Sequence, residues 1–296
     1  MATPDILYHY CNTDSFVSII RTQSIRLSSL SLSNDRMEGR LIKAALLRLA
    51  ERDGLNEDSK VELRESLAFN ERYFDGLGFC LSSNGDLLSQ WRGYADDACG
   101  ISIGFGVPYL KSLVQAESIN DSNFGLHAVK YKQVEHESEI GDIYTELRKL
   151  IDAGAFKRPG MSGLLDTRSP LRMVADDKAI EKANAQLILK LFELAPKQFT
   201  LKAQAFSEEK EWRLVSVIEG TNFDGCEYRP SRNRVIPYRT IKLDDLMLKG
   251  TKRKLKPIRE VFLGPKNETP AIVVQAMLKQ AGLGDVSVKK SKATYR

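Results

Sequence analysis

Three segments of the chain carry side chains whose types and spacing are suited to chemistry. His9 lies in the apolar segment Ile6–Cys11, between two tyrosines. Tyr94 ends the segment SQWRGY, in which the tryptophan and the tyrosine stand three residues apart, at helical spacing. Glu209 and Glu211 stand two residues apart, directly before the apolar run WRLV. Paired carboxylates at the start of a strand can position a hydroxyl or stabilise a cationic transition state.

Each segment also has an ordinary structural interpretation. His9 is either a core histidine whose ring is satisfied by the backbone or a ligand-facing donor. Trp91 and Tyr94, three residues apart, are either two packing positions of one helix turn or part of a site. The acidic segment before WRLV is either a solvated turn or a pair of functional carboxylates. In SLSNDRMEG, Asp35 and Glu38 predict a capping box, with a loop over a ligand as the alternative.

The sequence contains no recognisable motif for a metal or a phosphate loop. The chain has three histidines, and His136-Glu137 fails as the start of H-E-x-x-H because residue 140 is isoleucine. Its four cysteines are widely spaced with no C-x-x-C pair, which argues against zinc, iron–sulfur clusters and a disulfide framework. We therefore expect no metal and a reducing, cytoplasmic setting.

Composition is typical of a soluble globular protein with a substantial core. The chain has 296 residues, of which 42% are hydrophobic and 28% charged. No run approaches the roughly 18 apolar residues of a membrane helix, and the N-terminal segment lacks the pattern of a secretory signal. We expect one α+β domain over residues 1–296, with no membrane partner. The oligomeric state is left open.

Hydrophobic periodicity places strand segments at both ends of the chain, around a mainly helical insertion at about 107–200. Predicted strands cover Ile6–Cys11, Leu77–Ser82, Gly100–Gly106, Glu211–Ile218, Asn233–Arg239 and Arg259–Pro265. The alternating segment Ile25–Leu32 is either a short strand or an extended loop. A helix should follow the first strand, because Asn12 or Thr13 can cap it and Phe16, Ile19 and Ile20 recur at helical spacing. Further predicted helices cover Leu41–Gly54, Ile140–Ile151, Ile180–Leu194 and Ala271–Gly282. A further short helix carries Ser89, Trp91 and Tyr94.

Several short motifs occur in an order that resembles a known family. They are LYHY, LSND-x-x-E, LLSQWRGYAD, GISIGF, EKEWRLV, IPY and the closing YR, spread over residues 7–296. In this order the chain is similar to the bacterial family known as domain of unknown function 2971. That family in turn resembles the ADP-ribosyltransferase fold, in the diphtheria-toxin-like branch that uses a His-Tyr-Glu triad.

The resemblance to that branch runs residue by residue. His9 stands at the histidine of L-x-H-G-T, and Ser89 and Tyr94 stand at the first serine and the tyrosine of S-x-S-x-x-Y. Glu211 matches the glutamate that opens a strand like E-Y-x-V. The chain departs from the pattern where Tyr-Cys replaces Gly-Thr after His9, where Trp91 replaces the second serine, and in its helical insertion.

The resemblance implies a split antiparallel β core and NAD as the substrate. Its chemistry would be cleavage of the nicotinamide–ribose bond, with ADP-ribose passing to a macromolecule or to water, as in some toxins and phage-defence effectors. It implies catalysis by Glu211, His9 and Tyr94, NAD contacts at His9, Tyr10, Ser82, Ser89, Trp91 and Tyr94, and acceptor contacts at Glu209 and Arg213. The alternative is a catalytically inactive module that binds a nucleotide or nucleic acid.

Positive charge gathers in one late stretch. Residues Arg229–Arg259 hold eleven Lys and Arg against Asp244 and Asp245. This stretch is either a solvated loop or an electrostatic footprint for nucleic acid or for the NAD pyrophosphate. The acceptor is therefore left open among protein, nucleic acid and water, with a slight preference for nucleic acid.

Overall fold

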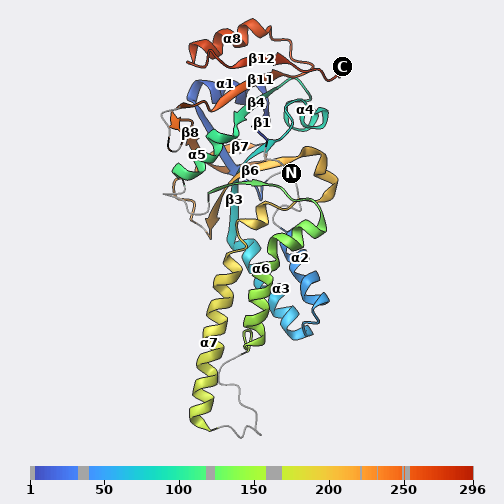
Figure 1. Ribbon diagram of the computed structural model, residues 1–296, viewed down its shortest axis with the longest axis vertical. Coiled ribbons are helices and arrows are strands. Elements are labelled where there is room, and N and C mark those ends of the chain that lie inside the picture. Colours follow the sequence, from blue (N-terminus) through green and yellow to red (C-terminus); the bar gives the residue numbers. More distant parts are fainter. Residues whose placement is uncertain are drawn as a thin grey trace.

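The computed structural model combines one large β-sheet with a group of helices that projects from it (Figure 1). It describes residues 4–32, 40–117, 124–157, 169–220, 222–231, 233–248, 250 and 254–295. The predicted capping box at Asp35 and Glu38 lies outside these ranges. The combination of helices with a β-sheet confirms the α+β class.

The elements have the following bounds along the chain. The strands are β1 (Ile6–Cys11), β2 (Ser24–Ser29), β3 (Phe74–Ser82), β4 (Ile101–Gly106), β5 (Gly125–Ala128), β6 (Glu211–Glu219), β7 (Glu227–Ser231), β8 (Arg234–Lys242), β9 (Leu246–Met247), β10 (Lys254–Leu255), β11 (Ile258–Leu263) and β12 (Ser287–Lys290). The helices are α1 (Thr13–Thr22), α2 (Leu41–Arg52), α3 (Glu57–Tyr73), α4 (Leu88–Tyr94), α5 (Val107–Glu117), α6 (Gln133–Asp152), α7 (Pro170–Phe192) and α8 (Ala271–Gln280), with 3-10 turns η1 (Lys197–Phe199) and η2 (Gln204–Glu209).

Strand β3 is the junction of the sheet. One of its edges pairs antiparallel with β6 along its whole length, from Phe74 opposite Glu219 to Ser82 opposite Glu211. Its other edge is shared, because Leu77 and Gly78 pair with β2 whereas only Ser82 pairs with β1. Strands β1 and β2 therefore diverge from this edge. The sheet divides there into a half ordered β12-β11-β4-β1 and a half that contains β6, β3, β2, β8 and β7.

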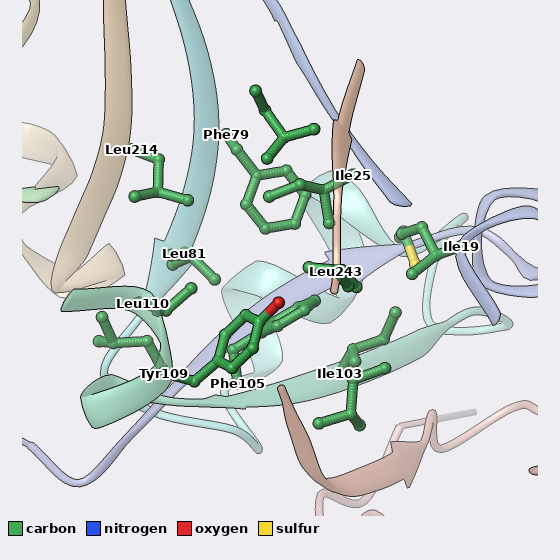
Figure 2. Close-up of a cluster of buried hydrophobic side chains, with 14 of the residues drawn as sticks. Ile19, Ile25, Phe79, Leu81, Ile103, Phe105, Tyr109, Leu110, Leu214 and Leu243 are labelled. Carbon is green, nitrogen blue, oxygen red and sulfur yellow. The ribbon is translucent and has the colours of Figure 1, made fainter. Parts of the chain in front are cut away.

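The main hydrophobic core lies on one face of the sheet. Inward-facing positions of several strands meet the apolar faces of α1, α5 and α8. Figure 2 shows the part of this core around Phe79, Phe105 and Tyr109. Its centre includes Phe79 from β3, Ile103 and Phe105 from β4, and Leu214 from β6, all buried. Helix α1 begins where the Asn12 side chain accepts a hydrogen bond from the Ser15 amide, as the sequence predicted for this position.

A second core lies inside the projecting helices α2, α3, α6 and α7 (Figure 1). Helix α6 supplies Ile140, Ile143, Leu147 and Ile151 at helical spacing, which buries one stripe against α2 and α7. The segment predicted as a helical insertion at 107–200 thus contains α6 and α7. It also contains α5, which packs on the sheet, and strand β5, which pairs with β6.

None of the described helices combines the length and the apolar composition that crossing a bilayer requires.

The connection from α4 to β4 is packed tightly against β1. Asp96, Asp97 and Ala98 all adopt the left-handed backbone region, with φ of 49°, 46° and 74°. The chain then turns at Gly100, whose amide donates to the Ala95 carbonyl at 2.8 Å. A Cβ atom at Gly100 would lie 2.2 Å from the Cys11 carbonyl oxygen, so only glycine fits there.

The variant Gly100→Ala should therefore lower the free energy of unfolding by about 1–3 kcal/mol, because the new methyl group must displace backbone rather than a mobile side chain. Gly141→Ala in α6 is the matched control, since nothing lies within 4 Å of its Cβ position. It should raise stability by about 0.5–1 kcal/mol. Urea unfolding measures both changes, and equal stability of the two variants would contradict the packing argument.

Candidate functional site

A cavity of about 310 Å³ opens where β1 and β2 diverge from β3. His9 from β1, Tyr94 from α4, and Glu209 and Glu211 from η2 and β6 all line it. These side chains come from three parts of the chain that together span about 200 positions. The structure thus brings the three predicted triad residues to a single pocket.

His9 is held as a neutral imidazole. Burial lowers its pKa to about 4, and its Nδ1 lies 2.8 Å from the Cys80 carbonyl oxygen. A carbonyl only accepts, so Nδ1 carries the proton and Nε2 carries a lone pair. The ring also stacks on Phe79 with centroids 4.1 Å apart. The backbone contact matches the first of the two interpretations of His9, and Nε2 is the ring nitrogen that remains able to accept a hydrogen bond.

Tyr94 stands at the mouth of the pocket. Its hydroxyl donates to Glu209 Oε1 at 3.0 Å, while 45% of its surface remains exposed. Burial of the hydroxyl and the neighbouring carboxylates raise the pKa of Tyr94, so the phenol stays protonated. An exposed ring with a fixed hydroxyl presents a π face on which a planar cationic group can stack.

Four buried charges form the floor of the pocket, and we call them the charge quartet: Lys202, Glu209, Glu211 and Arg213. Lys202 Nζ bridges the two acids, at 2.5 Å from Glu209 Oε2 and 3.0 Å from Glu211 Oε2. Arg213 Nε and Nη2 bind both oxygens of Glu211, at 2.8 and 3.0 Å. The quartet has zero net charge, which is what allows four ions to remain buried together.

Glu211 is ionised throughout the physiological range. Burial alone would raise its pKa, but Arg213, Lys202 and a hydrogen bond from Cys80 outweigh it and hold the pKa at about 2. These contacts occupy most of the roughly four acceptor positions of a carboxylate. Glu209 accepts from Tyr94 and Lys202, so it retains more capacity toward a ligand.

The remaining predicted contacts divide into two groups. Tyr10 lines the pocket and donates its hydroxyl hydrogen to the Asn84 carbonyl at 2.8 Å. Ser82, Ser89 and Trp91 do not line it. Ser82 donates to the Glu209 carbonyl at 2.7 Å, and Trp91 is fully buried against Tyr10. The Ser89 hydroxyl is buried, and no partner for it occurs among the described residues.

Sequence reasoning missed Lys202, although this lysine joins the two predicted carboxylates. Its backbone amide donates to the Lys130 carbonyl at 2.9 Å, which fixes residue 202 beside a segment more than seventy positions away. Tyr131, next in that segment, accepts from the Glu211 amide at 2.8 Å. No local pattern in the sequence points to this pairing.

The basic stretch at 229–259 does not form one patch within the described ranges. Arg229 lines the pocket of the charge quartet. Lys254, Lys256 and Arg259 line a separate cavity of about 580 Å³ beside β11. Lys254 and Lys256 pair there with Asp245 and Asp285, respectively, which reduces their attraction for phosphates. Residues 251–253 of this stretch lie outside the described ranges.

Over the described ranges, no group of three or more His, Cys, Asp or Glu side chains is arranged to hold a metal ion.

Comparison with models of known families finds a match over the middle of the chain. Residues 90–214 match the family model described as "Protein of unknown function (DUF2971)", which confirms the predicted resemblance to that family over this range. The range holds Tyr94 and the whole charge quartet, whereas His9 lies outside it. Neither a curated protein nor a solved structure gives a match.

Removing Lys202 should destabilise the fold strongly. Lys202→Met leaves Glu209 and Glu211 buried side by side without their shared cation, which typically costs about 3–5 kcal/mol. Lys254→Met, which removes an exposed ion pair, should cost less than about 1 kcal/mol. Denaturant unfolding at neutral pH compares the two variants. A small cost for Lys202→Met would show that the quartet is solvated.

The histidine gives a prediction for pH dependence. The pKa of His9 is about 4 in the folded chain and about 6.5 in the unfolded chain, so the unfolded state binds the proton first. Above pH 6.5 neither state binds this proton, so His9 does not reduce the free energy of unfolding. As the pH falls from 6.5 toward 4, the unfolded state is protonated and the free energy of unfolding decreases by up to about 1.4 kcal/mol per pH unit. His9→Gln should flatten the stability curve in this window. Parallel curves for the two proteins would contradict the assignment.

Proposed function

We propose that this pocket binds NAD and cleaves the bond between nicotinamide and ribose, with ADP-ribose passing to a macromolecule or to water. The observation that carries the proposal is the convergence of His9, Tyr94 and Glu211 on one cavity. A neutral imidazole, an exposed phenol ring and a permanently ionised carboxylate are the groups that this chemistry uses.

The proposed reaction is a substitution at the ribose carbon. The carbon–nitrogen bond breaks, its electron pair leaves with neutral nicotinamide, and an oxocarbenium-like centre develops on the ribose. A hydroxyl or water oxygen then forms the new bond and releases its proton. The Glu211 carboxylate stabilises the cationic centre electrostatically, since its low pKa keeps it charged.

The other residues position the reactants. Tyr94 stacks on the nicotinamide ring, and His9 Nε2 accepts a hydrogen bond from a ribose hydroxyl. A second ribose hydroxyl reaches Glu211 by replacing the thiol of Cys80, the weakest donor bound to that carboxylate. Glu209, with its remaining acceptor capacity, orients the attacking hydroxyl and takes its proton.

A second candidate is a nucleotide-binding module without catalysis. The observation that favours it is the engagement of Glu211 by Arg213 and Lys202, which leaves this carboxylate little room for substrate. Such a module would use the same pocket and bind NAD or a related nucleotide intact.

Incubation with labelled NAD tests the proposal. Glu211→Gln should reduce nicotinamide release by at least about 100-fold, because it removes the charge opposite the developing cation. Glu209→Gln should spare release but impair transfer of ADP-ribose to protein, DNA or RNA. Exposed Glu208 supplies the matched control, Glu208→Gln, which should behave as the wild type.

Chromatography of nicotinamide and of labelled acceptor measures both steps, with a thermal melt to confirm that each variant is folded. Binding of NAD without nicotinamide release from the wild type would support the second candidate. Loss of nicotinamide release in Glu209→Gln but not in Glu211→Gln would show that Glu209, and not Glu211, is the catalytic acid.

A further inference from the structure

The pocket continues away from the charge quartet along β2, β8 and β7. Ser28, Ile236, Arg229 and Ser231 line this extension. Arg229 and Ser231 are two residues apart on β7, so their side chains share one face of the strand. Ile236 is the cross-strand partner of Arg229 and provides the apolar wall between β7 and β2.

Arg229 adds a positive charge to the lining of this extension. Within the described part of the chain, no carboxylate forms an ion pair with Arg229. Glu227 lies two residues before Arg229 on β7, so it shares the same face of the strand. Glu227 accepts hydrogen bonds from the Tyr238 and Thr240 hydroxyls, at 3.0 and 2.5 Å. The charge quartet is neutral and supplies no compensating charge.

We propose that Arg229, with the hydroxyls of Ser28 and Ser231, forms an anion subsite for the phosphates of a dinucleotide. This proposal rests on the proposed function, because it assumes that the ribose end of the same ligand lies at the charge quartet. A guanidinium group suits a phosphate because its planar fork donates two parallel hydrogen bonds. The two serine hydroxyls add neutral donors beside it.

The layout of the strands limits the ligand to an extended molecule. Between β7, which carries Arg229, and β6, which carries Glu211, lie β8, β2 and β3. Each step between neighbouring strands is about 4.8 Å. A free nicotinamide ring or a single phosphate touches only one end of this path. A nucleoside diphosphate joined to a second ribose touches both ends.

Calorimetric titration with nicotinamide, ADP and ADP-ribose tests the subsite. Arg229→Gln should weaken binding of ADP and of ADP-ribose by about 10- to 100-fold, since it removes a charged hydrogen bond, and leave nicotinamide binding unchanged. Arg229→Lys should recover part of the loss, because lysine keeps the charge but not the fork. Arg259→Gln, from the same basic stretch but lining the other cavity, should bind all three ligands as the wild type does.

Three results would overturn the subsite: no binding of ADP or ADP-ribose by the wild type, unchanged affinity in Arg229→Gln, or an equal loss in Arg259→Gln. Failure of the proposed function gives a different pattern. If Arg229→Gln loses ADP-ribose while the wild type leaves NAD intact, the subsite stands and the cleavage reaction does not. If the wild type cleaves NAD and the KM of Arg229→Gln is unchanged, the reaction stands and the subsite does not.

Discussion

A strand has two edges, and β3 has three partners. Strand β6 takes one edge completely, so β1 and β2 must share the other, and each pairs with β3 over only one or two residues. Between them the backbone of β3 is left without a strand, and His9 supplies a hydrogen bond to the Cys80 carbonyl there. The same imidazole that satisfies the opened ladder also forms a wall of the pocket. The cavity is thus a direct consequence of how the sheet is paired.

Burial of the charge quartet follows from the pairing of β6 with β3. That register places Glu211 beside Ser82 and Arg213 beside Cys80, at the end of β3 where the sheet opens. Two acids two residues apart would normally repel each other in such an environment. Lys202 and Arg213 balance them, and the Arg213 guanidinium is anchored further by the Phe199 carbonyl at 2.9 Å. Pocket shape and pocket charge therefore share one structural origin.

Local patterns revealed much of this molecule. The strands β1, β3, β4, β6, β8 and β11 and the helices α1, α2, α6, α7 and α8 were visible as apolar periodicity. Helix α3 was missed because its buried face includes Lys60 and Asn70, whose polar groups find partners only in the folded chain. In α4, Tyr94 and Gln90 line the pocket, whereas Trp91 packs in the core. The three-residue spacing of Trp91 and Tyr94 alone does not show that the two side chains face different surroundings. The position of Lys202 is set by contacts between distant segments, which periodicity does not report.

The last described residues of the chain hold the connections on both sides of α4. Ser291 and the Lys292 amide bind the Asp86 carboxylate before this helix, and the Tyr295 hydroxyl binds Asp97 after it, at 2.8 Å. Asp86 also accepts from the Trp91 indole at 2.8 Å. During synthesis, Tyr94 can therefore emerge from the ribosome some two hundred residues before the contacts that fix its helix exist. A chain that ends between residues 236 and 291 therefore carries every lining residue of the pocket but lacks the contacts that hold the connections of α4.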